Sequence, residues 1–428
     1  MEMGMDTLRH PDTLAQRISG REVYIWGARH EGYAARLALQ RHDIPAAGYI
    51  DSSPSLAGTF AFGLPVTSPT SFFDAASPEV AFIVVASGFF ADDISESCLA
   101  RGWVKNADFA VYGELRRFNY QVDVAGMCNL RCISCPRGNW PRHRTPGFMS
   151  ATTYARLVDK ILRDDPWTGI MTLYNWGEPL LNPELPEILK ITRHKGLLSA
   201  VSSNLAMTKD FEEVIRAGPD WFRISNSGWG KHYETTHTGA RWDTFHANCR
   251  KISDYRRRHQ PNMIIEFFFH IYEHNRQDYP AIQAWCRELG FILRYRHAAL
   301  APLDNVERVV DGEPLTEAAS RTRALQFLGV EEVMEIARAE RHRPCYYLDH
   351  LWIDWDLSVA HCMEWYDPAL RLLPQDFLTV ELDDIARARA AGGHCRRCME
   401  KGIHRAYCVY GDETLIAAKS SIPVQQEG

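Results

Sequence analysis

Three cysteines lie close together in the sequence Cys128-Asn-Leu-Arg-Cys132-Ile-Ser-Cys135. Three thiolates on one tight loop can hold three irons of a [4Fe–4S] cluster and leave the fourth iron without a protein ligand. An open position on a metal can bind a substrate. The C-x3-C-x2-C spacing therefore predicts a catalytic iron–sulfur site at Cys128, Cys132 and Cys135. Zinc is the alternative, and it would need a fourth nearby ligand, for which His143 is the candidate.

A second group of cysteines lies in the last part of the chain. It consists of Cys345, Cys362, the C-x2-C pair Cys395 and Cys398, and Cys408. Four thiolates can saturate a [4Fe–4S] cluster, so we predict that the first four hold one auxiliary cluster, with a zinc knuckle as the alternative. Cys408 is then left over as a further ligand, a spacer, or a catalytic thiol that donates a hydrogen atom.

Short polar turns follow three of the strands predicted below. They are Gly177-Glu178-Pro179, Ser202-Ser203-Asn204 and Ser225-Asn226. Taken singly, each is also an ordinary turn sequence. In a barrel-like sheet of parallel strands, however, active groups gather at the carboxyl ends of the strands, so we expect these residues to form one site together. Further candidates at this edge are His270, Asn275, Arg294 and Arg296.

Cys128–Cys135 with the following Pro136-Arg137 resembles the signature of the radical SAM superfamily. The resemblance covers about residues 117–300. It implies that the open iron binds the amino and carboxylate groups of S-adenosylmethionine (AdoMet). One electron from the cluster then cleaves AdoMet to methionine and a 5′-deoxyadenosyl radical, which abstracts hydrogen from the substrate. An electron donor such as flavodoxin or ferredoxin is implied as a partner.

The polar turns fit the same resemblance. Trp176-Gly177-Glu178-Pro179 is similar to the family's Gly-Gly-Glu-Pro element, which implies that Gly177 and Glu178 lie at the methionine ammonium. Ser202–Asn204 is similar to a turn that reaches the ribose and carboxylate, and Ser225 to a serine near the ligand. One position departs from the pattern, because Ser134 stands where the family often has an aromatic residue against the adenine.

The C-terminal cysteines resemble the twitch or SPASM extensions of radical SAM enzymes, and their number is closer to the single-cluster twitch form. This resemblance implies one auxiliary [4Fe–4S] cluster. A nearby cluster can accept or donate an electron, which zinc cannot do.

The elements that must position these residues form two successive β/α patterns. Apolar runs at 21–26, 46–50 and 80–86 with a helical stretch between the first two predict a Rossmann-like lobe. A second series of strand-like runs, separated by helical stretches, predicts a partial (β/α)6 TIM-type barrel. Its runs are at 119–124, 168–174, 197–201, 220–225, 263–269 and 291–296.

The fold class is therefore α/β, with four predicted segments. They are a Rossmann-like lobe at 1–116, the radical SAM partial barrel at 117–300, a helical connector at 301–344, and a small loop-rich iron–sulfur domain of SPASM/twitch type at 345–428. Cys98, Cys249 and Cys286 stand alone in helix-like stretches, which is typical of buried core residues.

The N-terminal lobe carries a shortened glycine loop, Gly27-Ala-Arg-His-Glu-Gly32, with Asp51 at the end of the next strand. Such a loop could hold phosphate, and Asp51 could accept from a ribose hydroxyl, but the full G-x-G-x-x-G is missing. The stretch from Val23 to Thr67 is similar to the small lobe of bacterial sugar N-acyltransferases, which implies a sugar-nucleotide. A structural or docking role is the alternative.

Composition excludes several partners. The net charge of −6 and the absence of a run of Lys and Arg give no support to nucleic-acid binding. No stretch approaches the roughly 18 apolar residues that a membrane span needs. The N-terminus has no apolar signal region, so we expect a cytoplasmic protein whose thiols stay reduced.

Together these features predict a radical SAM oxidoreductase or epimerase that acts on a carbohydrate-like or sugar-nucleotide metabolite. Maturation of a ribosomal peptide is the second interpretation, and no winged-helix-like segment for a leader peptide precedes the predicted barrel. A non-catalytic iron–sulfur or zinc protein is the third, although such a protein would not need the polar strand ends.

Overall fold

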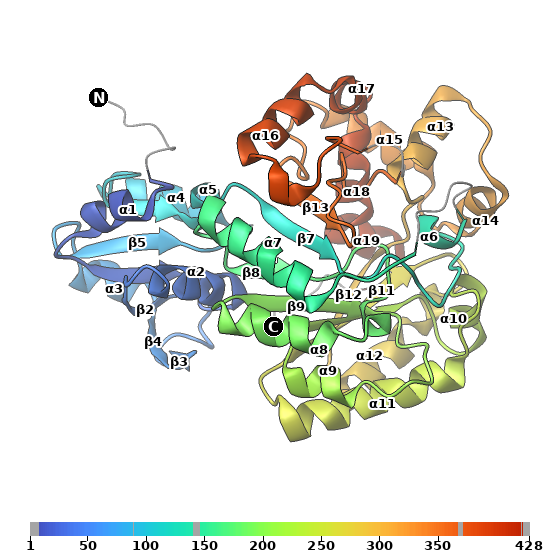
Figure 1. The fold of residues 1–428 in the computed structure, drawn as a ribbon, viewed down its shortest axis with the longest axis horizontal. Helices are drawn as coiled ribbons and strands as arrows, with labels where there is room; N and C mark the ends of the chain where they lie inside the picture. Colours follow the sequence, from blue (N-terminus) through green and yellow to red (C-terminus); the bar gives the residue numbers. More distant parts are fainter. Residues whose placement is uncertain (1–7, 89, 140–145, 367–370, 421, 423–428) are drawn as a thin grey trace. The chain divides into compact units, whose positions relative to one another are not determined.

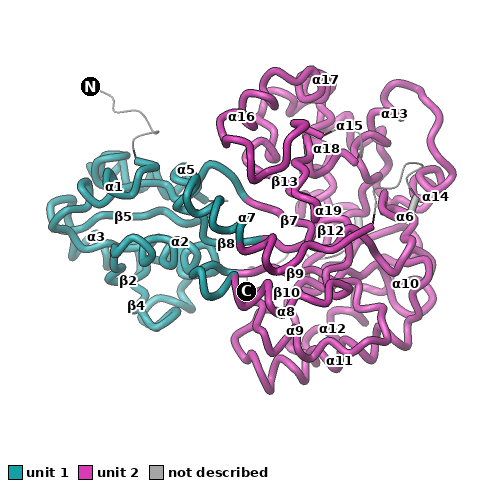
Figure 2. Tube along the Cα trace, in the orientation of Figure 1, with its two compact units in different colours: residues 1–119, 156–171, 192–198 teal, residues 120–155, 172–191, 199–428 magenta. Residues whose placement is uncertain are grey.

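The computed structural model describes residues 8–88, 90–139, 146–366, 371–420 and 422 (Figure 1). They divide into two compact units (Figure 2). Unit 1 comprises residues 1–119, 156–171 and 192–198, and unit 2 comprises residues 120–155, 172–191 and 199–428. Among the described residues, no helix has the length and apolar character that crossing a membrane requires.

Unit 1 is built on a six-stranded sheet with the order β3-β4-β2-β1-β5-β6. Its strands are β1 (Glu22–Trp26), β2 (Ala46–Ile50), β3 (Phe60–Ala61), β4 (Leu64–Thr67), β5 (Ala81–Val85) and β6 (Phe109–Val111). All pairs are parallel except β3 with β4. Every residue of β5 is buried, as expected for a parallel strand covered on both faces.

Helices cover both faces of this sheet. Side chains of α1 (Pro11–Ile18) and α2 (His30–Gln40) share one apolar cluster with Val23 and Ile25, and α3 (Pro69–Ala75) and α4 (Ala91–Leu99) share another with Ile83 and Val85. A short helix, α5 (Tyr112–Leu115), follows β6. This arrangement confirms the predicted Rossmann-like architecture, because helices lie on both sides of a mostly parallel sheet.

The glycine loop after β1 packs tightly within unit 1. A Cβ on Gly32 would lie 1.8 Å from the carbonyl oxygen of Gly27, so only glycine fits. Both carboxylate oxygens of Asp51 accept backbone N–H groups, from Ala28 (2.9 Å) and Ser53 (2.8 Å). Asp51 therefore shapes the loop itself.

Unit 2 contains most of a seven-stranded sheet with the order β12-β11-β10-β9-β8-β7-β13. Its strands are β7 (Asn119–Asp123), β8 (Ile170–Thr172), β9 (Leu198–Ser203), β10 (Trp221–Asn226), β11 (Ile264–Ile271), β12 (Ile292–His297) and β13 (His350–Asp354). The pairs β7–β8, β9–β10, β10–β11 and β11–β12 are parallel. The sheet is open, and the six strands predicted for the partial barrel are all present.

Helices of the β/α units follow these strands in the chain. They are α6 (Pro136–Asn139), α7 (Ala151–Asp164), α8 (Leu185–His194), α9 (Glu212–Ala217), α10 (Lys231–Thr236), α11 (Trp242–His259) and α12 (Tyr279–Leu289), with short 3-10 helices η2 (Pro179–Leu181) and η3 (Arg276–Asp278). Figure 1 shows α9, α11 and α12 along one side of strands β9 to β12. Cys98, Cys249 and Cys286 are at most 2% exposed, which confirms them as core residues.

Residues after β12 contain more helix than the sequence predicted. The helices are α13 (Leu303–Asp311), α14 (Glu317–Leu325), α15 (Val330–Ala339), α16 (Leu382–Ala391), α17 (Gly393–Glu400), α18 (Ala406–Tyr410) and α19 (Glu413–Ser420), with 3-10 turns η4 (Phe377–Thr379) and η5 (Ile403–Arg405). Residues 355–366 and 371–376 hold the loops that were expected here. Side chains of α13, α15, α17 and α18 share one apolar cluster, so the predicted connector and the C-terminal segment pack around a common core.

Candidate functional site

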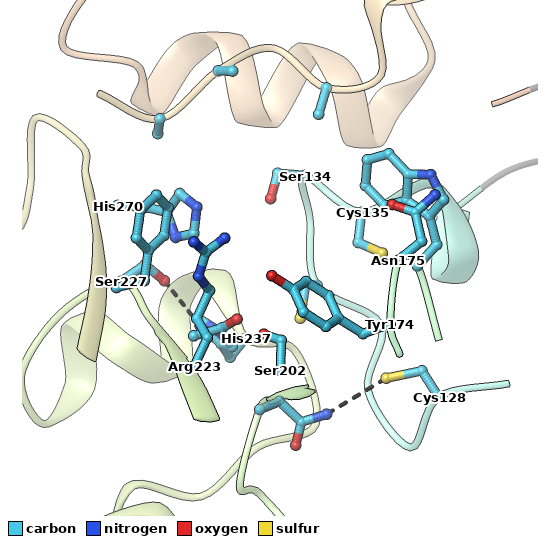
Figure 3. A pocket seen from close by; sticks show the side chains of 18 of the residues that line it. Cys128, Ser134, Cys135, Tyr174, Asn175, Ser202, Arg223, Ser227, His237 and His270 are labelled. Atoms are coloured by element: carbon cyan, nitrogen blue, oxygen red, sulfur yellow. Dashed lines mark hydrogen bonds between the residues drawn. The ribbon is translucent and has the colours of Figure 1, made fainter. Parts of the chain in front are cut away.

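A cavity of about 400 Å³ lies in unit 2, at the carboxyl ends of the parallel strands (Figure 3). Most of the predicted site residues line it together, although they come from four separate strand ends. These residues are Cys128, Cys132, Cys135, Gly177, Glu178, Ser202, Ser203, Asn204 and Ser225. Pro179 and Asn226 are not part of the lining.

The cysteine loop between β7 and α6 is held by backbone hydrogen bonds to the residues that end α10 and follow it. The N–H of Arg131 donates to Thr238 O (2.9 Å) and that of Ile133 to Thr236 O (3.1 Å). Leu130 and Ile133 are buried, so they anchor the loop while the cysteines between and beyond them reach the cavity. The position of each thiol is thus set by its apolar neighbours.

Two donors point at the first thiol. Cys128 Sγ accepts from the N–H of Leu130 (3.4 Å) and from Asn204 Nδ2 (3.5 Å), and Figure 3 marks the side-chain bond at Cys128 with a dashed line. Burial, together with the nearby Glu178 and Cys135, raises the pKa of Cys128 to about 12, and burial and the other two thiols raise the pKa of Cys132. A bound cation would offset the cost of ionising these grouped thiols.

The three thiols suit an iron–sulfur cluster better than one ion. Among the described residues, no three His, Cys, Asp or Glu side chains converge closely enough to hold a single metal ion. Cysteines that hold a [4Fe–4S] cluster each bind a different iron, so they need not converge on one point. His143, the candidate fourth ligand for zinc, lies outside the described residues.

Asp123, the last residue of β7, fixes the loop after β8. Its carboxylate is fully buried and accepts from the N–H groups of Trp176 (3.1 Å) and Gly177 (3.1 Å). Burial and the neighbouring Asp354 raise the pKa of Asp123. A Cβ on Gly177 would lie 1.6 Å from Ala125 O, so this close approach of two strand-end loops requires glycine. No sequence motif indicates that Asp123 supports the site in this way.

Glu178 joins three of the strand-end loops. Its N–H donates to Met127 O (2.9 Å), Oε1 accepts from the N–H of Leu180 (3.1 Å), and Oε2 accepts from the N–H of Asn204 (2.9 Å). The side chain is 2% exposed, and this burial raises its pKa to about 7. Glu178 therefore braces the site, and it also contributes a carboxylate to the cavity lining.

The turns after β9 and β10 place their polar groups differently. Ser203 Oγ accepts from the N–H of Leu205 (3.0 Å), and Ser202 projects into the cavity in Figure 3. Asn226 is fully buried and closes its own turn, because Nδ2 donates to Gly228 O (3.0 Å) and Oδ1 accepts from the N–H of Gly228 (2.9 Å). A direct cofactor contact by Asn226 stays a prediction without support from this geometry.

The missing aromatic residue at Ser134 has a neighbour that could replace it. Ser134 and Tyr272 both line the cavity, and their side chains are close enough for Ser134 to act on the pKa of Tyr272. Tyr272 follows β11, far from the cysteine loop in sequence, which explains why the cysteine motif alone does not reveal it. An aromatic ring is therefore present beside the position where the family pattern would place one.

The wall formed by β10, β11 and β12 carries basic side chains. Arg223 Nε donates to Glu266 Oε1 (2.6 Å), and Figure 3 shows Arg223 and His270 projecting into the cavity. Of the four further candidates at this edge, His270 and Arg296 line the cavity, whereas Asn275 and Arg294 do not. Glu364 and Tyr407 complete this wall from the C-terminal segment, and sequence analysis missed both.

The four predicted ligands of the auxiliary cluster come together in a second cavity of unit 2. Cys345, Cys362, Cys395 and Cys398 line a space of about 30 Å³, surrounded mainly by apolar side chains such as Leu303, Trp365 and Met399. Cys408 lines neither cavity, but it lies close enough to Cys345 to contribute to the raised pKa of that thiol. Its role as a hydrogen donor therefore stays a prediction that the geometry does not support.

No protein-family model matches the chain. YfkA of Bacillus subtilis (strain 168) is 25% identical over 135 residues, which are 30% of this chain and 34% of that protein. The chain thus spans about a third of the length of the curated relative that it matches.

Three solved structures are similar in fold. Native anSMEcpe with bound AdoMet is 12% identical, with 72% of this chain and 92% of that chain covered and a TM-score of 0.43. BtrN in complex with AdoMet and 2-DOIA is 14% identical (68% and 90% covered, TM-score 0.38). Streptococcus suis SuiB bound to precursor peptide SuiA is 11% identical (80% and 88% covered, TM-score 0.47). At these identities the similarity concerns the fold alone.

Proposed function

We propose that this chain is a radical SAM enzyme. It cleaves AdoMet at a [4Fe–4S] cluster held by Cys128, Cys132 and Cys135, and it removes hydrogen from a carbohydrate-like or sugar-nucleotide metabolite. The observation that carries the proposal is the shared cavity. The three thiols, Gly177–Glu178 and Ser202–Asn204 line it together, as an open-iron cluster with a polar ligand beside it requires.

The residues of the chain have separate tasks at this site. The three thiols bind the cluster, and Asn204 holds Cys128 through its amide. Glu178 keeps the loops in register through its backbone contacts. It would lie at the ammonium of AdoMet, whose positive charge would favour the ionised form of this carboxyl. When bound, the cluster and AdoMet together supply the 5′-deoxyadenosyl radical that takes a hydrogen atom from the substrate. The polar turns position the cofactor, and the wall with Arg223 and His270 faces the substrate.

The second cysteine group would hold one auxiliary [4Fe–4S] cluster. Cys345, Cys362, Cys395 and Cys398 provide the four thiolates that saturate a cluster, and their small apolar cavity has no room for a substrate. Such a cluster supplies one-electron transfer, which suits dehydrogenation. Thiolates of both groups must stay reduced, so we place the protein in the cytoplasm, with flavodoxin or ferredoxin as the class of electron donor.

Anaerobic reconstitution followed by addition of reductant and AdoMet tests the proposal. We expect about eight irons per chain and release of 5′-deoxyadenosine. Failure to release 5′-deoxyadenosine in a sample with its full iron content would refute the proposed AdoMet cleavage. Deuterium transfer into 5′-deoxyadenosine from labelled sugars or sugar nucleotides would support the substrate class, whereas transfer only from labelled peptides would favour ribosomal peptide maturation.

A further inference from the structure

One basic residue of the cavity wall is held in place by the C-terminal segment. Arg296, near the end of β12, donates from Nη2 to the carbonyl oxygen of Tyr407 in α18 (2.8 Å). The centre of its guanidinium lies 5.4 Å from the centroid of the Tyr407 ring. Both side chains line the large cavity. The guanidinium is thus oriented before any ligand binds, which reduces the entropy that binding would cost.

The same wall presents donors that lack an acceptor. Arg296 Nε and Tyr407 Oη are buried, and neither has a hydrogen-bond partner within the described residues. Asn175 Nδ2 and Trp176 Nε1, which belong to other lining residues, are buried without a partner in the same way. A buried donor without an acceptor is unfavourable, and each of these four groups can donate. The cavity is therefore matched to a ligand rich in acceptor oxygens.

Arg296 and Arg223, the two arginines of this wall, differ in their ion pairs. Arg223 forms an ion pair with Glu266 (2.6 Å), whereas no carboxylate among the described residues forms an ion pair with Arg296. Glu364 also lines the cavity, and the charge of Arg296 acts to lower its pKa, but burial outweighs this and raises that pKa to about 7. Burial and the charge of Arg296 lower the pKa of His270 to about 3, so this ring is neutral. The guanidinium fork is thus available for a ligand.

We propose that Arg296, with the Tyr407 hydroxyl, binds an oxyanion of the substrate, either a carboxylate or a phosphate group. An arginine fork matches the geometry of both groups and binds them with two parallel hydrogen bonds. This inference rests on the proposed function, and it narrows the substrate from carbohydrate-like metabolites in general to acidic ones. A neutral sugar would leave Arg296 unpaired in the occupied cavity.

Calorimetric titration of the cluster-loaded full chain tests this assignment in the presence of saturating AdoMet. Inorganic pyrophosphate represents the phosphate source and succinate the carboxylate source. We expect one of them to bind, and we expect Arg296→Gln to weaken that binding about tenfold or more. The anion affinity of Arg296→Lys should lie between those of the wild type and Arg296→Gln, because lysine keeps the charge without the fork. Tyr407→Phe should lose less affinity than Arg296→Gln.

Arg294→Gln is the matched control, because Arg294 lies on the same strand and outside the cavity lining. Equal affinity of the wild type and of a folded Arg296→Gln variant would overturn the inference, as would no binding of either anion. Displacement of the anion by AdoMet would also overturn it, because Arg296 would then belong to the cofactor site. Release of 5′-deoxyadenosine by the wild type without any anion tests the proposed function separately, so the two failures are distinguishable.

Discussion

The two cysteine groups of unit 2 occupy cavities of very different size and lining. Cys128, Cys132 and Cys135 open onto about 400 Å³ with polar strand-end residues around it, whereas the four C-terminal thiols enclose about 30 Å³ among apolar side chains. Metal sites in proteins follow the same division, since catalytic sites keep an open position and structural or electron-transfer sites are closed by protein ligands. The number of thiols and the volume beside them therefore indicate different tasks within one chain.

Their polar neighbours differ as well. Around the first group, Glu178 and Asn204 tie the loops together and leave groups facing the cavity. In the second group, Cys395 Sγ lies 3.3 Å from His361 Nε2, and the buried Arg389 lies among the thiols. A buried guanidinium offsets negative charge on a closed cluster, while the open site must leave room for a charged ligand.

Removal of one thiol of the open site should have the largest effect. We expect Cys132→Ala to abolish release of 5′-deoxyadenosine and to lower the iron content by about four atoms per chain, because three thiolates are the minimum set for this cluster. Iron analysis and chromatography of the reaction mixture measure both quantities. Cys286→Ala, in the core, is the control, and equal loss in both variants would contradict the assignment.

Gly177→Ala should reduce turnover without removing any ligand. The added Cβ would lie 1.6 Å from Ala125 O, so the loop between the cysteines and Glu178 must shift. A misplacement of about 1 Å at an active site can lower a rate by about a hundredfold. We expect weaker AdoMet binding and slower release of 5′-deoxyadenosine at unchanged iron content. Gly113→Ala, where a Cβ meets no atom within 4 Å, should behave as wild type.

Removal of a thiol of the closed site should separate the two groups. We expect Cys395→Ala to lose about four irons per chain while it still releases 5′-deoxyadenosine when no substrate is present. Under the proposed function the open site would hold its cluster with its own three cysteines, so it should remain reducible and active. Loss of all iron, or of AdoMet cleavage, would show that the closed site is needed for the open one to form.

A smaller effect should appear in the pH dependence of stability of the iron-free chain. Burial raises the pKa of Glu178 from 4.5 to about 7, so the folded chain keeps a proton that the unfolded chain has released within this window. The contribution of this carboxyl to stability should fall as pH rises from about 4.5 to 7 and then stay constant. Glu178→Gln has no such proton. The thermal midpoint of the variant minus that of the wild type should therefore increase between about pH 5 and pH 8. A difference that does not change with pH would contradict this.

Local sequence patterns predicted the strands of both sheets well. The run at 263–269 corresponds to β11 (Ile264–Ile271) and the run at 220–225 to β10 (Trp221–Asn226), because each is an apolar stretch bounded by turn residues. The pairing of β13 with β7 could not be predicted in this way. It joins segments more than two hundred residues apart, and no local periodicity encodes such a pairing.

The sequence identified site residues only where they belong to a recognisable motif. The cysteine spacing and the turns with Glu178 and Asn204 identified one wall of the cavity before any geometry was known. Arg294 and Arg296 were equal candidates, since residues two apart share a face of a strand, and only the depth along β12 brings Arg296 to the cavity. Tyr407 comes from a helix of the C-terminal segment, so only tertiary packing places it there.

Strand β13 has a practical consequence for anyone who shortens this protein. It is an edge strand of the sheet whose neighbouring strand, β7, leads directly into the cysteine loop. Deletion of the C-terminal residues would expose unpaired N–H and C=O groups along β7, and exposed edges of this kind recruit other chains and aggregate. The closed cysteine site is thus not a detachable module. Truncated forms are expected to be recovered as insoluble protein rather than as a minimal enzyme.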